Sequence, residues 1–189
     1  MSQPRFGRRR ALVAFAMASA LAVLSVAPAS ATMFVRERYH DTDAFSYDDC
    51  GPVVDVTVEF GGRFQVRTGT GKDAGAFFAH DRYWWHETHV SEDGRTYTVA
   101  GDGIFQETRA TRIEGTIFQF VAIDAGKLFT IRDADGDVVV RDRGRISQSI
   151  LFDVTDDGVP GGIFIEELWW DPKGVFESLD FDFCSLWAD

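Results

Sequence analysis

Residues 54–67 read VDVTVEFGGRFQVR, and this stretch decides the fold class. Valine and phenylalanine alternate with polar residues on both sides of the Gly61-Gly62 dipeptide. Such alternation is typical of a half-buried β-strand, because successive side chains of a strand point to opposite faces. A Gly-Gly dipeptide between two alternating runs favours a two-residue hairpin turn. We therefore expect two short antiparallel strands joined at Gly61-Gly62.

Similar short apolar runs, separated by Gly and Asp, continue almost to the C-terminus. They cover residues 83–90, 96–100, 104–113, 116–123, 128–132, 138–143, 147–154, 163–170 and 175–186. No stretch outside the N-terminal apolar run has the 3.6-residue period of an amphipathic helix. The pattern predicts one all-β domain over residues 51–189, an antiparallel meander barrel of about eight to ten strands. A β-sandwich is the alternative.

Residues 116–123 carry apolar side chains on both faces of the expected strand. Ile117, Val121 and Ile123 alternate with Phe118 and Phe120. A strand with two apolar faces is expected to be buried on both sides. This pattern fits a barrel with a filled lumen or an interface with another chain.

The N-terminus has the three parts of a secretory signal peptide. Basic residues up to Arg10 precede an uninterrupted apolar run, residues 11–27. Small residues then end at Ala31, which favours cleavage between Ala31 and Thr32. We expect residues 1–31 to be a signal peptide with a helical apolar segment, followed by a polar lead over residues 32–50. The arginines before the apolar run also fit a twin-arginine signal, so either export route leads to a secreted protein.

The chain is acidic, with 19 basic and 30 acidic residues and a formal net charge of −11. Removal of the signal peptide would take four arginines and no acidic residue, leaving a more negative chain. Nucleic acids and anionic membranes repel such a protein, because both are bound by neutralising phosphates. We therefore expect neither as a partner.

Cys50 and Cys184 are the two cysteines, and they flank nearly all of the expected strands. In a secreted protein an even pair is expected to be oxidised. A disulfide across so long a loop would stabilise the fold by about 4–5 kcal/mol in the chain-entropy account. The sequence predicts a Cys50–Cys184 staple.

The run YWWHETH, residues 83–89, is the most suggestive stretch for chemistry. On a strand, His86 and His89 point to opposite faces, so they cannot share a metal without a bulge. The sequence is also one residue short of the helical His-Glu-x-x-His zinc motif. We favour a tryptophan-rich strand with a hydrogen-bonded histidine, and we expect no metal site.

Glu166 and Glu167 stand within the run IFIEELWW, residues 163–170. Because strand faces alternate, one of the two is expected among large apolar side chains, where burial would raise its pKa. Pairing with an arginine is the commoner outcome, but a raised pKa also suits a general acid or base. Our hypothesis is a polar cluster in the lumen, drawn from His86, Glu107, Arg109 and one of Glu166 and Glu167.

Other motifs are read as structural. Residues 133–137, DADGD, begin like a calcium loop, but position twelve is Gly144 in place of the bidentate glutamate. We expect a hairpin turn there. The sequence contains no serine-nucleophile, phosphate-loop or dinucleotide motif, so we expect no cofactor.

Residues 103–113, 116–123 and 138–154, rich in Phe and Ile and joined by acidic-Gly turns, resemble the small allene-oxide-cyclase-like barrels. Lipocalin-like barrels share the coarse pattern, although the Gly-x-Trp near the first lipocalin strand is absent. The composition is also similar to that of secreted actinobacterial proteins. The resemblance implies a small barrel and no particular activity.

Three functions fit these patterns. The first is binding of a small apolar ligand or an extracellular partner. The second is a cofactor-free cyclase or isomerase that uses a buried carboxylate. The third is a structural or interaction protein that associates with itself, and a lumen filled by Phe and Trp side chains would favour it.

Overall fold

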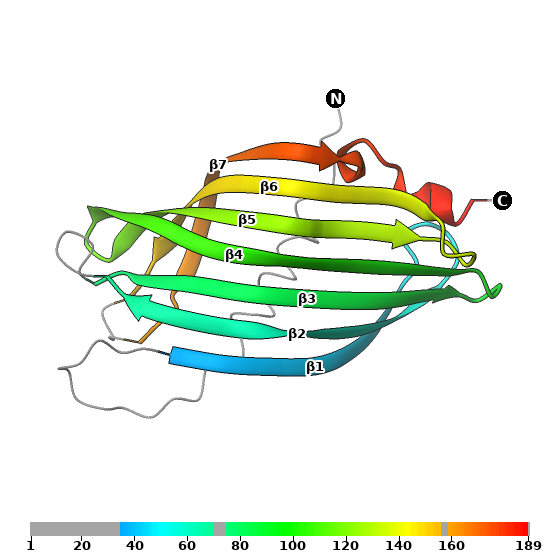
Figure 1. Cartoon of the computed structure of the whole chain (residues 1–189), viewed down its shortest axis with the longest axis horizontal. Coiled ribbons are helices and arrows are strands. Elements are labelled where there is room, and N and C mark those ends of the chain that lie inside the picture. The colour runs from blue at the N-terminus through cyan, green and yellow to red at the C-terminus, as the bar shows by residue number, and fades with distance from the viewer. Residues whose placement is uncertain (1–34, 70–74, 156–158, 189) are drawn as a thin grey trace.

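The structure is a computed structural model that describes residues 35–69, 75–155 and 159–188. Its seven strands form one antiparallel sheet in which each strand pairs with the next along the chain (Figure 1). They are β1 (Val35–Tyr47), β2 (Val54–Thr68), β3 (Phe77–Ser91), β4 (Thr96–Glu114), β5 (Ile117–Arg132), β6 (Val138–Asp153) and β7 (Ile163–Phe176). The prediction of an all-β meander is confirmed. The expected signal peptide and its cleavage position between Ala31 and Thr32 lie outside the described residues.

The strands are fewer and longer than predicted, because several glycines that were expected in turns lie inside strands. Gly61 and Gly62 are in the middle of β2, paired with β1 on one side and β3 on the other. The predicted break between residues 123 and 128 likewise lies within β5. The hairpin expected at residues 133–137 is confirmed, since Gly136 N–H donates to the Asp133 carbonyl at 3.1 Å.

A row of glycines crosses the sheet from β4 to β7. Gly103 pairs with Gly126, Gly126 with Gly144, and Gly144 with Gly174. Gly126, Gly144 and Gly174 have φ of +154°, +152° and +140°. A Cβ on Gly144 would lie 2.2 Å from the Lys173 carbonyl oxygen. This row brings neighbouring backbones close together, and glycine kinks of this kind curve a sheet.

The sheet is not closed into a barrel, and β1 and β7 form its two edges. In an antiparallel meander of seven strands, the first and last strands run in the same direction, so pairing them directly would be parallel. β1 lies within the segment that we expected to be a polar lead, so the first strand begins earlier than the apolar alternation indicates. Its many charged and polar side chains suit an exposed edge strand.

The apolar core lies on one face of the sheet, which we call the inner face; the opposite face is the outer face. One end of the inner face holds Phe78, Ala110, Phe118 and Phe120, all buried. In the segment expected to be buried on both sides, Phe118, Phe120 and Ala122 are buried, while the outward residues Ile117, Gln119, Val121 and Ile123 are half-buried. The second face of β5 is therefore only partly covered.

The other end of the inner face is covered by residues 177–188, which we call the C-terminal strap. It contains two short 3-10 helices, Glu177–Leu179 and Phe183–Leu186, and no helix among the described residues is long and apolar enough to span a bilayer. In Figure 1 the strap lies at one end of the sheet, drawn in red. The ring centroid of Phe183 is 5.8 Å from that of Phe129, and Trp187 packs against Tyr97 at 5.0 Å.

Trp187 is buried with Val54 and Val56, so the strap extends from β6 to β2. At its start, Ser178 N–H donates to Asp142 Oδ1 at 3.0 Å. The predicted disulfide is confirmed, and Cys50 and Cys184 tie the β1–β2 connection to the strap.

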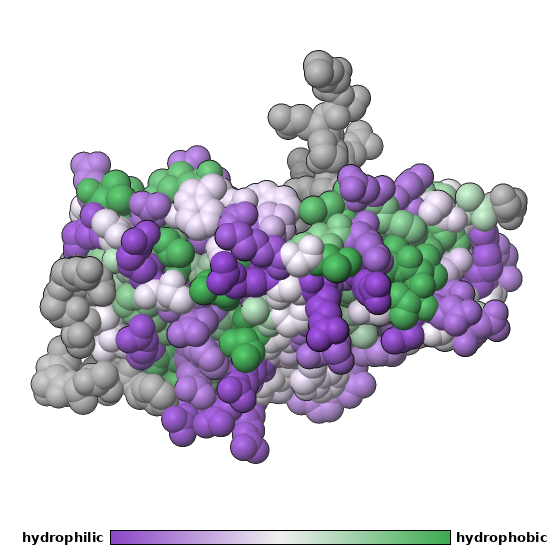
Figure 2. Space-filling view, turned by 45° about the horizontal axis from the view of Figure 1, so that its top comes forward, coloured by the Kyte–Doolittle hydropathy of each residue, from purple (hydrophilic) through white to green (hydrophobic). Residues whose placement is uncertain are grey.

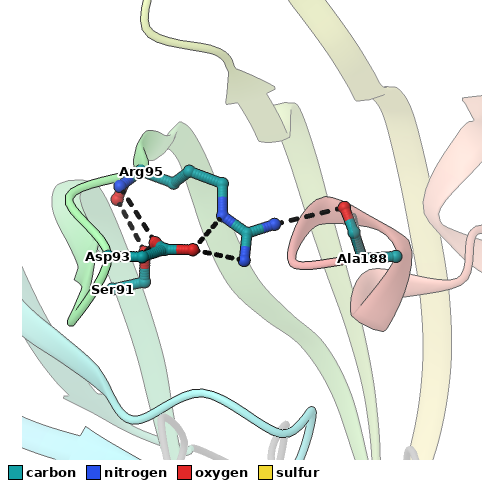
Figure 3. A network of polar contacts seen from close by, with 4 residues as sticks. All are labelled: Ser91, Asp93, Arg95 and Ala188. Atoms are coloured by element: carbon teal, nitrogen blue, oxygen red, sulfur yellow. Dashed lines mark hydrogen bonds and ion pairs between the residues drawn. The ribbon is translucent and has the colours of Figure 1, made fainter.

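A polar network fixes the last residues of the strap to the β3–β4 turn (Figure 3). Arg95 Nε donates to Asp93 Oδ2 at 2.8 Å, and Arg95 Nη1 donates to the Ala188 carbonyl at 3.1 Å. The Ser91 hydroxyl also donates to Asp93. The hydrogen bonds from Arg95 and Ser91 hold the pKa of the Asp93 carboxyl well below its usual range. One arginine therefore joins a hairpin turn to the end of the strap.

Candidate functional site

The stretch 83–89 lies on β3, and its side chains alternate between the two faces as predicted. Tyr83 and Trp85 are half-buried on the inner face, while Trp84 and His86 are exposed on the outer face. His89 is on the inner face, where its ring nitrogen lies 2.8 Å from Glu87 Oε2. His86 and His89 therefore point away from each other. Among the described residues, no group of three His, Cys, Asp or Glu side chains could hold a metal ion.

The outer face of β1, β2 and β3 contains a shallow depression of about 510 Å³, which we call the outer hollow. Small side chains leave this space open, because Ala44, Thr57 and Thr88 lie side by side across the three strands. Its lining residues are Thr42, Asp43, Ala44, Thr57, Val58, Glu59, His86 and Thr88. Asp43 pairs with Val58 of the inner face, so the polar side chains that the hollow presents are three threonine hydroxyls, the Glu59 carboxylate and the His86 imidazole.

Trp84 is two residues before His86 on the same face of β3, although it is not among the residues that line the outer hollow. Its indole ring packs against the β2 backbone at Gly61, where an added Cβ would be only 3.0 Å from the ring. The residue remains 39 % exposed. The ring centroid of His40 is 5.6 Å away, so an imidazole stands beside the indole.

Glu59 connects Trp84 and His40 with the hollow. It pairs directly with His86 in the β2–β3 register, and its Oε1 lies 2.8 Å from His40 Nε2. Both side chains of the His40–Glu59 contact are well exposed, so both remain accessible to a ligand. Carboxylate, imidazole and hydroxyl groups together offer several donors and acceptors beside one apolar ring.

On the inner face, two tyrosines each cross a glycine to reach an aspartate two strands away. Tyr39 of β1 lies over Gly62 and donates to Asp81 Oδ2 at 2.7 Å. Tyr83 of β3 lies over Gly103 in the same way and donates to Asp124 Oδ1 at 2.7 Å. The same Tyr-Gly-Asp arrangement thus occurs twice, displaced by two strands.

These two pairs contain no basic side chain, and burial dominates their protonation. Burial raises the pKa of Asp81 and of Asp124, although the tyrosine hydroxyls oppose the shift. Burial and the neighbouring carboxylates also raise the pKa of Tyr39 and Tyr83. Asp81 is only 3 % exposed, and its Oδ1 has no hydrogen-bond partner among the residues that the structure describes. The pairs lie within the packed interior, so we assign them a structural role.

Glu107 is the one candidate catalytic residue from the sequence that is not exposed, and it is half-buried on the inner face. The β3–β4 pairing ends at His80 and Gln106, and Glu107 Oε2 accepts from the Ala79 N–H at 2.6 Å in place of the next ladder bond. Burial raises the pKa of Glu107 to about 7. The adjacent cavity is about 60 Å³ and would hold about two water molecules.

The other predicted residues do not gather around Glu107. His86 and Arg109 are exposed, and Glu166 and Glu167 are exposed on β7. The expectation that one of these two glutamates is surrounded by apolar side chains is wrong. β7 is an edge strand, and every residue from Ile163 to Asp171 is exposed.

The outer hollow was not predicted from the sequence. Its residues on β1 lie in the segment that was assigned to a polar lead, and Gly61 was assigned to a turn. The sequence feature that could have indicated it is the presence of Trp84 and His86 at alternate positions of one strand, where both side chains share a face. No protein-family model matches the chain, and no curated protein or solved structure is significantly similar to it.

Proposed function

We propose that this protein is a secreted binding protein whose outer hollow takes a small hydroxylated ring compound, such as a sugar. The observation that carries the proposal is a depression lined by Glu59, His86 and threonine hydroxyls, on the same face as the exposed Trp84 ring, which stands next to the Glu59 partner His40. Small-molecule sites combine an aromatic or apolar wall with a few polar groups that fix orientation. A sugar ring offers both an apolar face and hydroxyl groups.

The charge of the chain supports a neutral ligand over an anionic one. The formal net charge is −11, and the Glu59 carboxylate lines the hollow on the outer face. Carboxylates accept hydrogen bonds from hydroxyl groups, whereas they repel phosphates and other carboxylates. A neutral polyhydroxylated ligand is therefore favoured.

The packing of the inner face leaves little room there for a small apolar ligand, which was one part of the first function expected from the sequence. Phe181, Phe183 and Trp187 of the strap occupy one end, and phenylalanines pack the other. The cavity beside Glu107 has a volume of only about 60 Å³, too small for such a ligand. The outer hollow is within the usual size range of ligand sites.

The test is calorimetric titration of the purified protein with a panel of neutral mono- and oligosaccharides, together with tryptophan fluorescence. We expect binding to at least one member of the panel and a loss of affinity of about tenfold or more in Trp84→Ala. Trp84→Phe should retain part of the affinity, because it keeps an aromatic face.

The matched control is Trp169→Ala, because Trp169 has a similar exposure, 43 %, but lies on β7, far along the sheet order from the hollow. This variant should bind like the wild type. Equal affinities in wild type and Trp84→Ala, or the absence of binding across the panel, would contradict the proposal.

A further inference from the structure

β7 exposes more large apolar side chains than any other described strand. Its exposed members are Ile163, Phe164, Ile165, Leu168, Trp169, Trp170 and Val175, and Ile163 reaches 63 %. Figure 2 shows hydrophobic areas, in green, between the polar areas of the visible surface. An apolar edge strand is a template for pairing with another strand, and monomeric proteins usually protect such an edge.

The opposite edge is protected in this way, whereas β7 is much less so. β1 carries charged side chains along its length, including Arg36, Arg38, Asp41 and Asp43. β7 has Pro172 and two bulges in its pairing with β6, but its remaining surface is aromatic and aliphatic. The molecule therefore has one edge suited to solvent and one suited to a partner.

Strand direction favours a second copy of the chain as that partner. β1 and β7 of one copy run in the same direction, so a single chain can join its edges only by parallel pairing. A two-fold axis perpendicular to the strands would pair β7 with β7 of a second copy in antiparallel fashion, as in every other pairing of the sheet. Such an interface is isologous, the commonest arrangement in homodimers.

The charges of β7 fit this two-fold pairing when the axis passes through Trp170. On β6, the residue opposite Trp170 is Gln148. Glu166 lies opposite Leu151, three positions along β6 in one direction, and Lys173 lies opposite Arg145, three positions in the other direction. Both lie on the outer face, because a bulge separates Glu166 from Trp169. Antiparallel pairing would then place Glu166 of each copy opposite Lys173 of the other.

The present contact of Lys173 does not oppose this rearrangement. Its Nζ lies 3.2 Å from Asp171 Oδ2, but both side chains are more than half exposed. Exposed ion pairs of this kind contribute little to stability. Pro172 lacks an N–H and so removes one possible donor, a loss that edge strands tolerate.

We propose that the protein forms a homodimer in which β7 pairs with β7 of a second copy around Trp170. The interface would bury the aromatic and aliphatic side chains of both edge strands and join the two sheets into one. Cross-strand pairs of opposite charge favour this register over its neighbours.

Light scattering coupled to size exclusion, with sedimentation velocity, tests the proposal on the purified wild-type protein. We expect a dimer whose dissociation constant rises about tenfold or more in Lys173→Glu and in Glu166→Lys. The double variant Glu166→Lys/Lys173→Glu restores the opposite charges and should regain most of the wild-type affinity. Far-UV circular dichroism confirms that each variant retains its sheet.

Glu167→Lys is the matched control, because Glu167 is the exposed neighbour of Glu166 but pairs with Ile150 on the inner face. It should dimerise like the wild type. A wild type that stays monomeric at every concentration overturns the proposal. If that monomer sediments with neutral lipid vesicles, the apolar edge binds a membrane and the dimer proposal is equally overturned. A dimer that resists both single reversals, or a double variant that fails to recover, also overturns it.

Discussion

Gly61 and Gly62 each leave room for one aromatic side chain, on opposite faces of β2. Gly61 allows Trp84 to lie flat on the outer face, and Gly62 allows Tyr39 to cross toward Asp81. From the sequence, a Gly-Gly dipeptide between alternating runs favours a turn. A tight turn and a strand position crossed by an aromatic ring both require a residue without a Cβ, so glycine alone does not tell them apart. Only the partner strands distinguish the two, and their side chains are not in the local sequence. For the same reason His86 could be placed on the correct strand, whereas its neighbours across the sheet could not be identified.

At Glu107, the predicted consequence of burial is a pH-dependent stability. The folded-state pKa is raised from 4.5 to about 7, so the charged carboxylate is disfavoured in the folded protein. The contribution is most favourable below about pH 4.5 and is lost as the pH rises to about 7, by at most about 3 kcal/mol. In Glu107→Gln, which keeps an acceptor for the Ala79 N–H, this part of the pH dependence should disappear.

Urea unfolding of both proteins at several pH values between 4.5 and 8 measures the difference. Asp81 and Asp124 have shifts in the same direction, but they are present in both proteins and cancel in the comparison. Glu114→Gln, at an exposed carboxyl of the same strand, is the control and should follow the wild type. Parallel curves for wild type and Glu107→Gln would show that Glu107 does not titrate in this range.

At the scale of the elements, the alternation of apolar and polar residues identified most strand positions. The number of strands was predicted too high, because glycines that lie inside strands were expected in turns. The period of two is a property of each strand and is visible locally. A glycine kink depends on how closely the next backbone approaches, so Gly126 and Gly144 have no local mark that separates them from turn glycines. β1 escaped detection because an edge strand with two exposed faces has little apolar alternation.

Gly144→Ala tests the kink. The added Cβ would lie 2.2 Å from the Lys173 carbonyl oxygen at a φ of +152°, so we expect a loss of about 3 kcal/mol or more in the free energy of unfolding. Gly136→Ala, in an open turn at a φ of +88°, should cost only about 1 kcal/mol. Chemical denaturation of the two variants measures the difference, and equal losses would mean that the sheet tolerates a side chain in the glycine row.

For the whole molecule, the disulfide staple and the all-β meander were predictable, while the open sheet and the strap were not. Cysteine spacing and strand periodicity are recorded in the sequence itself. Closure depends on the number and direction of strands, and seven strands leave two edges of the same direction. The strap segment was assigned to a last strand because residues 175–186 carry several apolar side chains, and these pack across other strands instead.

Removal of the disulfide should weaken the strap and the fold together. Cys50→Ser/Cys184→Ser opens a link between residues 134 positions apart, for which the chain-entropy account gives a loss of about 4–5 kcal/mol. We expect a lower melting temperature and a red shift of tryptophan emission, because Trp187 is 4 % exposed in the closed strap. Unchanged stability and emission in this variant would show that the strap is held by its packing alone.

The strap also determines the order in which the protein can be assembled. Each strand contacts its neighbours in the chain, so the sheet can grow hairpin by hairpin as successive segments become available. The strap, by contrast, returns across β6, β5, β4 and β2, and Cys184 follows every strand in the sequence. The apolar end beneath it therefore stays uncovered until the last segment arrives. During that interval the growing sheet would depend on a chaperone to avoid aggregation, because the disulfide can form only after Cys184 has arrived.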